Sequence, residues 1–131
     1  MILTQLQRRV LLGDVLVLAV TTVAGFASHG VTGAWARMAL TFVLALGGWL
    51  WFAPWFGLLD ESVCRRPGRV WWRIIWAWTA TGPFVTVVRT LLLGTTLNPV
   101  FTLVFTSTNI LAFLVWRVLY ALRSSKGYTN P

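Results

Sequence analysis

The sequence predicts an all-α fold, an integral membrane four-helix bundle with both termini on the cytoplasmic side. Four apolar stretches are each long enough to cross the hydrocarbon core of a bilayer, and short connections join them. Hydrophobic residues make up 57% of the 131 residues and charged residues 11%, more apolar surface than a soluble domain of this size can bury. We expect one transmembrane domain covering residues 1–131.

The first span is predicted from about Val10 to Ala27, after the segment MILTQLQRR. A signal peptide has a similar outline, with a basic start, an apolar run and small residues at its end. Asp14 inside the apolar run argues against a signal peptide. The sequence therefore predicts an uncleaved helix.

The second span is predicted from about Trp35 to Leu58. Trp49, Trp51 and Trp55 crowd its far end, and tryptophan prefers the headgroup level of a bilayer. We interpret them as one half of an aromatic belt. Pro54 is expected to kink or end the helix.

The segment from Asp60 to Arg69, DESVCRRPGR, is the one substantial loop that the sequence predicts. A third span follows from about Val70 to Gly94 and opens with WWRIIWAW, the expected second half of the belt. The pair Gly82-Pro83 near its middle should bend the helix. The segment TTLNP leads to a fourth span from about Val100 to Leu122.

The distribution of basic residues predicts the orientation. With a cytoplasmic N-terminus, nine of the 11 Lys and Arg residues fall on the cytoplasmic side: Arg8, Arg9, Arg65, Arg66, Arg69, Arg73, Arg117, Arg123 and Lys126. Only Arg37 and Arg89 fall on the other side. This bias follows the positive-inside rule, so we expect a multi-pass protein of the cell inner membrane with both termini in the cytoplasm.

Several function classes have no support in the sequence. It contains no Ser-His-Asp set, phosphate-binding loop or paired carboxylates, so we expect no enzymatic activity and no catalytic residues. Nucleic-acid binding needs an exposed basic face, whereas these arginines are scattered beside membrane spans. No metal site or other cofactor is expected, because His29 is the single histidine and Cys64 lies on the opposite side. Axial ligation of a haem- or chlorophyll-type metal by His29 is the remaining alternative.

Each predicted span carries one stripe of small or polar residues at helical spacing. The stripes are Asp14, Leu18, Thr21, Gly25 and Ser28; Arg37, Thr41, Ala45 and Gly48; Thr79, Gly82, Thr86 and Arg89; and Thr102, Thr106, Asn109, Phe113 and Arg117. Close helix packing explains such stripes, because small residues allow close approach and hydroxyls bond across helices. A polar pathway through the bundle is the alternative.

Ionisable residues form an inner layer near the cytoplasmic end of the predicted bundle. A carboxylate inside hydrocarbon is costly unless it is paired, so Asp14 needs a cation. Arg117 lies on the stripe of the fourth span and is the preferred partner, with Arg73 second. We interpret the pair as structural, and a proton-relay role for Asp14 is the alternative.

An outer layer holds His29, Arg37 and Arg89 at similar depth, with no acidic residue on that side. Arg89 could snorkel to the headgroups. Otherwise three inward-facing cations would bind an anion, which makes these residues a candidate anion or lipid site.

The chain resembles DUF3054, a family of small bacterial and archaeal membrane proteins of unknown function. Asp14 in the first span and the small stretch ending at His29 carry the resemblance. Further residues that match the pattern are Trp78, Gly82, Pro83, Arg89, Pro99, Phe101, Trp116 and Arg117. The resemblance implies four helices and no established activity.

We therefore expect a non-enzymatic accessory or structural subunit that packs in a larger membrane complex or in a homo-oligomer. Its other partners would be the lipid bilayer itself and an anionic lipid, and no nucleic acid. The alternative is a small transporter, or an anion or proton pathway through the bundle, that uses Arg37, Arg89 and Asp14.

Overall fold

The computed structural model describes residues 3–28 and 35–126, which form an all-α fold without a strand in those ranges. Its helices are α1 (Gln5–Ser28), α2 (Trp35–Trp55), α3 (Glu61–Cys64), α4 (Pro67–Leu93) and α5 (Pro99–Lys126). The all-α class is thus confirmed. The short helix α3 lies in the segment that the sequence predicts as loop, so the element count was wrong by one.

Helix α1 begins five residues before the predicted start, because a capping box holds its first turn. The Thr4 hydroxyl accepts a hydrogen bond from the Gln7 backbone N–H at 3.2 Å, and the Gln7 side-chain oxygen accepts one from the Thr4 N–H at 3.0 Å. Each side chain satisfies a backbone donor that the helix itself leaves unpaired. The polar residues before the apolar run therefore belong to the helix.

Helix α2 ends three residues before the predicted end, just after Pro54. Gly57 has a φ of 72°, which favours glycine. The Gly57 N–H donates to the Pro54 carbonyl and the Leu58 N–H to the Ala53 carbonyl, both at 3.1 Å, in a Schellman motif. The motif turns the chain toward α3, whose residues Val63 and Cys64 are buried.

Helices α4 and α5 are joined by a short connection with a cap on each side. Gly94, with φ 66°, ends α4, and the Asn98 side-chain oxygen accepts hydrogen bonds from the Val100 and Phe101 N–H groups at the start of α5. Pro67 stands at the first position of α4, where its missing N–H costs nothing. Helix α4 continues through Pro83 without interruption.

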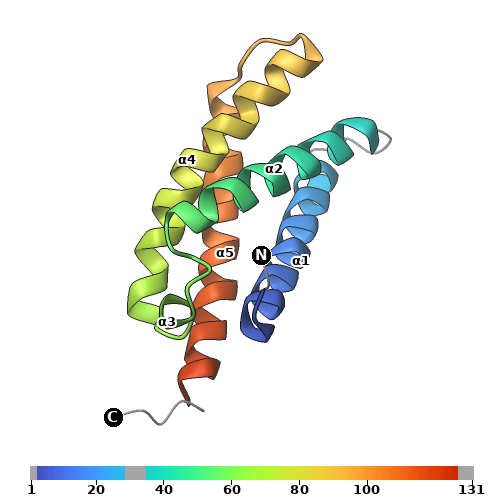
Figure 1. Ribbon diagram of the computed structural model, residues 1–131. Helices are drawn as coiled ribbons and strands as arrows, with labels where there is room; N and C mark the ends of the chain where they lie inside the picture. The colour runs from blue at the N-terminus through green and yellow to red at the C-terminus, as the bar shows by residue number, and fades with distance from the viewer. Residues whose placement is uncertain (1–2, 29–34, 127–131) are drawn as a thin grey trace.

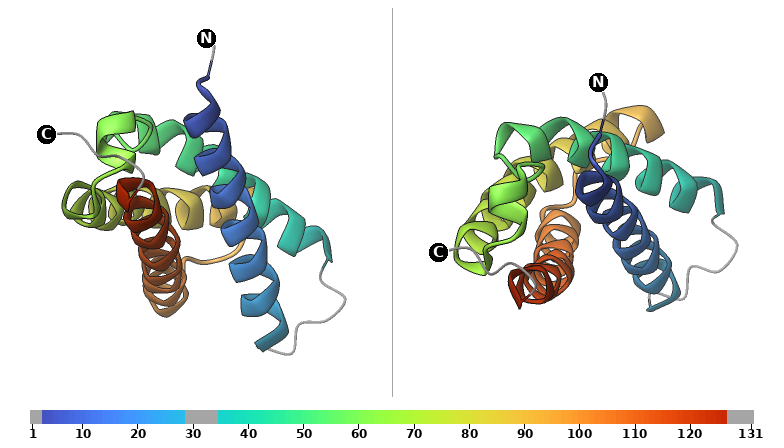
Figure 2. Two further views of the ribbon diagram at one scale, coloured as in Figure 1. Left: turned by 90° about the horizontal axis from the view of Figure 1, so that it is seen from below. Right: turned by 60° about the horizontal axis from the view of Figure 1, so that its bottom comes forward.

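The four long helices pack in a ring in which α1 contacts α2, α2 contacts α4, α4 contacts α5 and α5 contacts α1. Figure 1 shows α4 and α5 side by side along most of their length, with α2 crossing obliquely in front of them. The two further views in Figure 2 show α5 between the first part of α4 and α1. The start of α1, the helix α3 and the end of α5 lie at one end of the molecule, which we call the α3 end.

Two of the described helices are long and apolar enough to cross a membrane: α2, and residues Pro99–Ser124 of α5. Helix α1 carries Arg8, Arg9 and Asp14, and α4 carries three arginines. The fold is thus a small helical protein with two helices of membrane-spanning character among the residues described.

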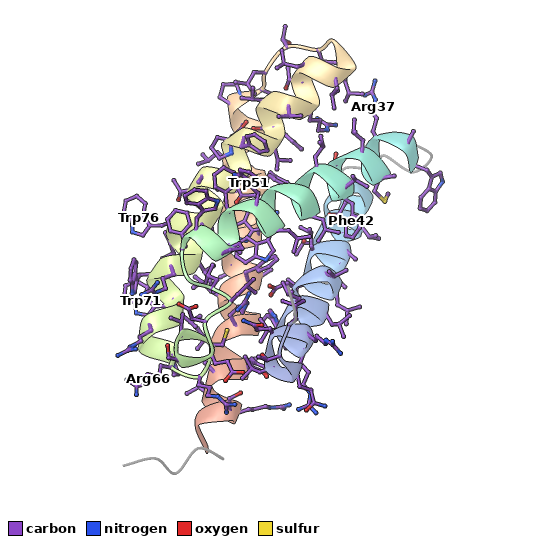
Figure 3. All side chains as sticks on the ribbon, in the orientation of Figure 1. Arg37, Phe42, Trp51, Arg66, Trp71 and Trp76 are labelled. Carbon is purple, nitrogen blue, oxygen red and sulfur yellow. The ribbon has the colours of Figure 1, made fainter. Side chains whose placement is uncertain are left out.

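The tryptophans divide between the surface and the core. Six are exposed: Trp35, Trp51, Trp55, Trp71, Trp72 and Trp76. Figure 3 shows Trp71 and Trp76 projecting away from the bundle. Trp49 and Trp78, which the sequence pattern assigned to an aromatic belt, are instead fully buried. That interpretation was wrong for these two, because both indoles face the neighbouring helices of the ring.

Candidate functional site

Most of the small and polar stripe residues lie in the interior of the helix ring. In the part of the chain that the structure describes, seven polar or charged residues are buried: Asp14, Thr22, Thr41, Thr81, Thr86, Asn109 and Arg117. Arg37 and Thr79 depart from their predicted inward stripes and are exposed. The buried polar groups separate into two regions, one near the α3 end and one near the opposite end, which we describe in turn.

Near the α3 end, Asp14 of α1 and Arg117 of α5 form a bidentate ion pair in which each side chain is only 1% exposed. The Arg117 Nη2 lies 2.6 Å from Oδ2, and the Arg117 Nε lies 2.9 Å from Oδ1. The indole N–H of Trp49 donates to Oδ2 at 3.0 Å, and that of Trp116 donates to Oδ1 at 2.9 Å. We call these four residues the Asp14 cluster; its carboxylate accepts four hydrogen bonds, which offset the cost of burying the charge.

Arg117 also ties the cluster to the turn after α2 and to α3. Its Nη1 donates to the Leu58 carbonyl at 2.8 Å and lies 3.5 Å from the Cys64 Sγ. The Cys64 thiol donates to the same carbonyl at 3.2 Å. Burial raises the pKa of the Cys64 thiol, although the nearby Arg117 opposes the shift. The thiol is therefore a neutral donor here.

Arg73, the second expected partner of Asp14, does not reach the carboxylate. Its position on α4 places it beside the turn after α2, where its Nη1 donates to the Phe56 carbonyl at 2.8 Å. The guanidinium lies over the ring of Trp72, 4.7 Å from the ring centroid. Arg73 thus binds backbone and an aromatic face rather than the Asp14 cluster.

Three aromatic rings separate the Asp14 cluster from the other half of the bundle. The centroid of Trp49 lies 5.3 Å from that of Trp78 and 4.6 Å from that of Phe113, and the Trp78 and Phe113 centroids are 5.2 Å apart. All three residues are fully buried, and Leu18 packs in the same core. We call the three rings the aromatic layer.

Beyond the aromatic layer lies a cavity of about 380 Å³, which residues of all four long helices line. We call it the Arg37–Arg89 cavity; its lining residues are Thr21, Thr22, Gly25, Arg37, Thr41, Arg89, Asn98, Val100, Phe101, Val104, Phe105, Thr108 and Asn109. Among the described residues, the lining holds two cations and no carboxylate. His29, the third member of the expected outer layer, lies outside the described residues.

Arg89 is held in place at the wall of this cavity. Its Nε donates to the Thr41 hydroxyl at 2.9 Å, and that hydroxyl donates to the Arg37 carbonyl at 2.8 Å. Its guanidinium lies over the Phe101 ring, 4.9 Å from the ring centroid, at cation–π distance. The structure thus brings Arg37 and Arg89 to one cavity from two different helices.

Two kinds of partner were missed in the sequence. Trp49 and Trp116 bind the Asp14 carboxylate, and the available signal was that a carboxylate inside a helix bundle needs several hydrogen-bond donors. Thr22 lines the cavity although it lies one residue off the predicted stripe. Its hydroxyl is buried and has no hydrogen-bond partner among the described residues.

Comparison with protein-family patterns gives a match. The family described as protein of unknown function (DUF3054) matches residues 11–120, and the chain belongs to that family. Neither a curated protein nor a solved structure matches the chain.

Proposed function

We propose that this member of the DUF3054 family is a four-span protein of the cell inner membrane that serves, without enzymatic activity, as an accessory subunit of a larger membrane complex or of a homo-oligomer. The observation that carries the proposal is the division of the helices into an apolar outside and a polar inside whose buried carboxylate, Asp14, is already paired with Arg117. Such a protein contributes surfaces and packing rather than reactive groups.

The apolar outside supports the membrane assignment for all four long helices. On α1, Leu12, Leu16 and Val20 repeat every four residues and are 65%, 66% and 65% exposed. Large apolar residues are also exposed on α2, α4 and α5. A soluble protein rarely exposes apolar surface of this extent, whereas lipid contacts it without cost.

The exposed cations support the orientation with both termini in the cytoplasm. Arg8, Arg9, Arg66, Arg69 and Arg123 are all exposed. They lie on the helix ends that meet at the α3 end, as the ribbon in Figure 1 shows. A cytoplasmic α3 end satisfies the positive-inside rule.

A topology experiment tests this arrangement. Reporter fusions after Ser124 and at Thr95 are expected to fall on opposite sides of the membrane, because one span separates them in the proposed topology. The fusion after Ser124 should report the cytoplasm, and a fusion at Asp60 should match it. Fusions at Ser124 and Thr95 on the same side would overturn the four-span proposal.

The interior supports a packing role over transport. The Asp14 carboxylate is fully engaged by Arg117 and two indoles, and the aromatic layer lies between it and the Arg37–Arg89 cavity. A solute path would have to cross that layer. A transporter or ion pathway remains the second candidate, which the cavity itself favours.

The exposed tryptophans supply a surface for a partner subunit. Trp71 and Trp76 project from α4, and Trp51 and Trp55 lie on α2 with ring centroids 6.5 Å apart. Large aromatic side chains are enriched at the centres of protein interfaces and contribute much of their binding energy.

Purification in mild detergent, with native mass measurement, tests the accessory role. The wild-type chain is expected to migrate as a complex larger than a monomer. Replacing Trp71 and Trp76 by Ala should lower recovery of the partner about tenfold or more, the loss typical of interface tryptophans.

Trp35→Ala is the matched control. Trp35 is also exposed, at 69%, but it is the first residue of α2, and the start of α2 lies away from the α3 end. A wild-type monomer without partners would contradict the proposal. Solute movement by that monomer in reconstituted vesicles would establish the second candidate instead.

A further inference from the structure

We propose that the Arg37–Arg89 cavity binds a phosphate group that belongs to an amphiphilic molecule, such as the headgroup of an anionic phospholipid. The inference goes beyond the accessory role, since it concerns a ligand site within one chain. Four features of the cavity carry it: its charge, the presentation of Arg89, its unpaired polar groups and its apolar wall.

The charge of the cavity requires a counter-charge. Arg37 and Arg89 line the same space from α2 and α4, and no acidic side chain of residues 3–28 or 35–126 lines it. Arg89 is partly buried and Arg37 is exposed; two neighbouring cations repel each other, and an anion between them removes that repulsion. Arginine is suited to phosphate, because its planar fork donates two parallel hydrogen bonds.

Arg89 is presented as a preorganised donor. The bond from its Nε to Thr41 and the Phe101 ring beneath the guanidinium fix the orientation of the side chain. Its two terminal amino groups make no hydrogen bond to any described residue, so both are available to a ligand. A snorkelling arginine would extend to the headgroups instead of being fixed by a neighbouring helix.

Neutral donors complete the polar side of the cavity. The Thr22 side chain is 7% exposed, and its hydroxyl has no partner in the described part of the chain. The first turn of α5 also lines the cavity; its Val100 and Phe101 N–H groups are capped by Asn98, and the positive end of the helix dipole favours a negative charge there. The Thr22 hydroxyl is therefore an independent sign that a polar group is missing from this space.

The α5 side of the cavity is largely apolar and suits a hydrocarbon portion. Val100, Val104, Phe101 and Phe105 line it, and Val100 and Val104 are 68% and 49% exposed. The volume of about 380 Å³ falls within the range of small-molecule sites, so the cavity holds more than one bare anion. A phosphate joined to an apolar part fits both walls.

Binding to the wild-type protein is the first test. Native mass spectrometry is performed on protein exchanged into phosphatidylglycerol or into phosphatidylcholine, and thermal melting is measured with added glycerol phosphate. Retained phosphatidylglycerol in preference to phosphatidylcholine supports a lipid headgroup as the source. A rise in melting temperature with glycerol phosphate alone supports a free phosphate ester. Absence of both effects, or equal retention of the two lipids, overturns the proposal.

Variants locate the ligand. Arg89→Gln is expected to weaken retention about tenfold or more, as the loss of a charge-assisted hydrogen bond does, and Arg89→Lys to recover it only in part. Thr22→Val, which keeps the shape and removes the hydroxyl, should weaken retention less. Arg69→Gln is the matched control, because it removes the same charge from the same helix at the α3 end.

The melting temperature of each variant without ligand shows whether it is folded. Unchanged ligand retention in folded Arg89→Gln, or an equal loss in Arg69→Gln, would place the anion elsewhere and overturn the assignment to this cavity.

Discussion

Asp14→Ala is expected to lower the free energy of unfolding by about 3–5 kcal/mol, the loss typical when one partner of a buried ion pair is removed. The substitution leaves the Arg117 guanidinium buried without its carboxylate. It also removes the acceptor of the Trp49 and Trp116 indole N–H groups. Reversible unfolding in detergent, followed by tryptophan fluorescence, measures the effect.

A double-mutant cycle separates the interaction energy between Asp14 and Arg117 from the effects of the two single substitutions. Adding Arg117→Ala to Asp14→Ala should cost less than the sum of the two single losses, because the second substitution removes the cation that the first left unpaired. Asp60→Ala is the control, since Asp60 is exposed in the turn before α3. Additive losses, or an Asp60→Ala effect as large as that of Asp14→Ala, would show that the pair does not stabilise the fold.

The helices and their inward stripes were predictable because apolar length and helical spacing are local properties of the sequence. The choice of Arg117 over Arg73 as the partner of Asp14 used the same spacing, since Arg117 continues the stripe through Asn109 and Phe113. The structure places the two charges together. The hydrogen bond from Arg73 to the Phe56 carbonyl could not be predicted, because it depends on the Schellman turn that follows α2.

The helix boundaries were less predictable from hydropathy, because caps decide them. The Thr4–Gln7 capping box was present in the sequence, but it lies outside the apolar run that defined the first span. Helix α3 consists of a single turn in a polar segment, too short to show any periodicity. Both errors come from taking the apolar segment as the whole helix.

The composition of the candidate site depended on contacts between helices. The positions of Arg37 and Arg89 along their helices predicted that the two residues lie at the same level of the bundle, and they line one cavity. Depth does not tell which face of a neighbouring helix meets them, so Thr22 and Phe101 were not foreseen as lining residues. Trp49 was misassigned for the same reason: its level fits a belt, and only the position of Asp14 on α1 shows that its indole points inward.

Gly13→Ala adds only one methyl group, yet it should lower the free energy of unfolding nearly as much as the loss of a residue that is hydrogen-bonded to Asp14. The methyl carbon would overlap the six-membered ring of Trp116, so the indole must move away from α1. Movement of the ring breaks its hydrogen bond to Asp14. Overpacking and the lost bond together should lower the free energy of unfolding by about 2–4 kcal/mol.

Gly47→Ala is the matched control, because Gly47 also lies within a long helix but a methyl group there would meet no atom within 4 Å. It should be neutral or stabilise the protein by up to about 1 kcal/mol, since alanine favours a helix over glycine. Trp116→Phe supplies the second arm: the smaller ring leaves room for the methyl group, so Gly13→Ala should cost less in that background than in the wild type. Equal costs of Gly13→Ala in the two backgrounds would mean that α1 and α5 are not in contact at this level, and the position of Trp116 in the Asp14 cluster would then be wrong.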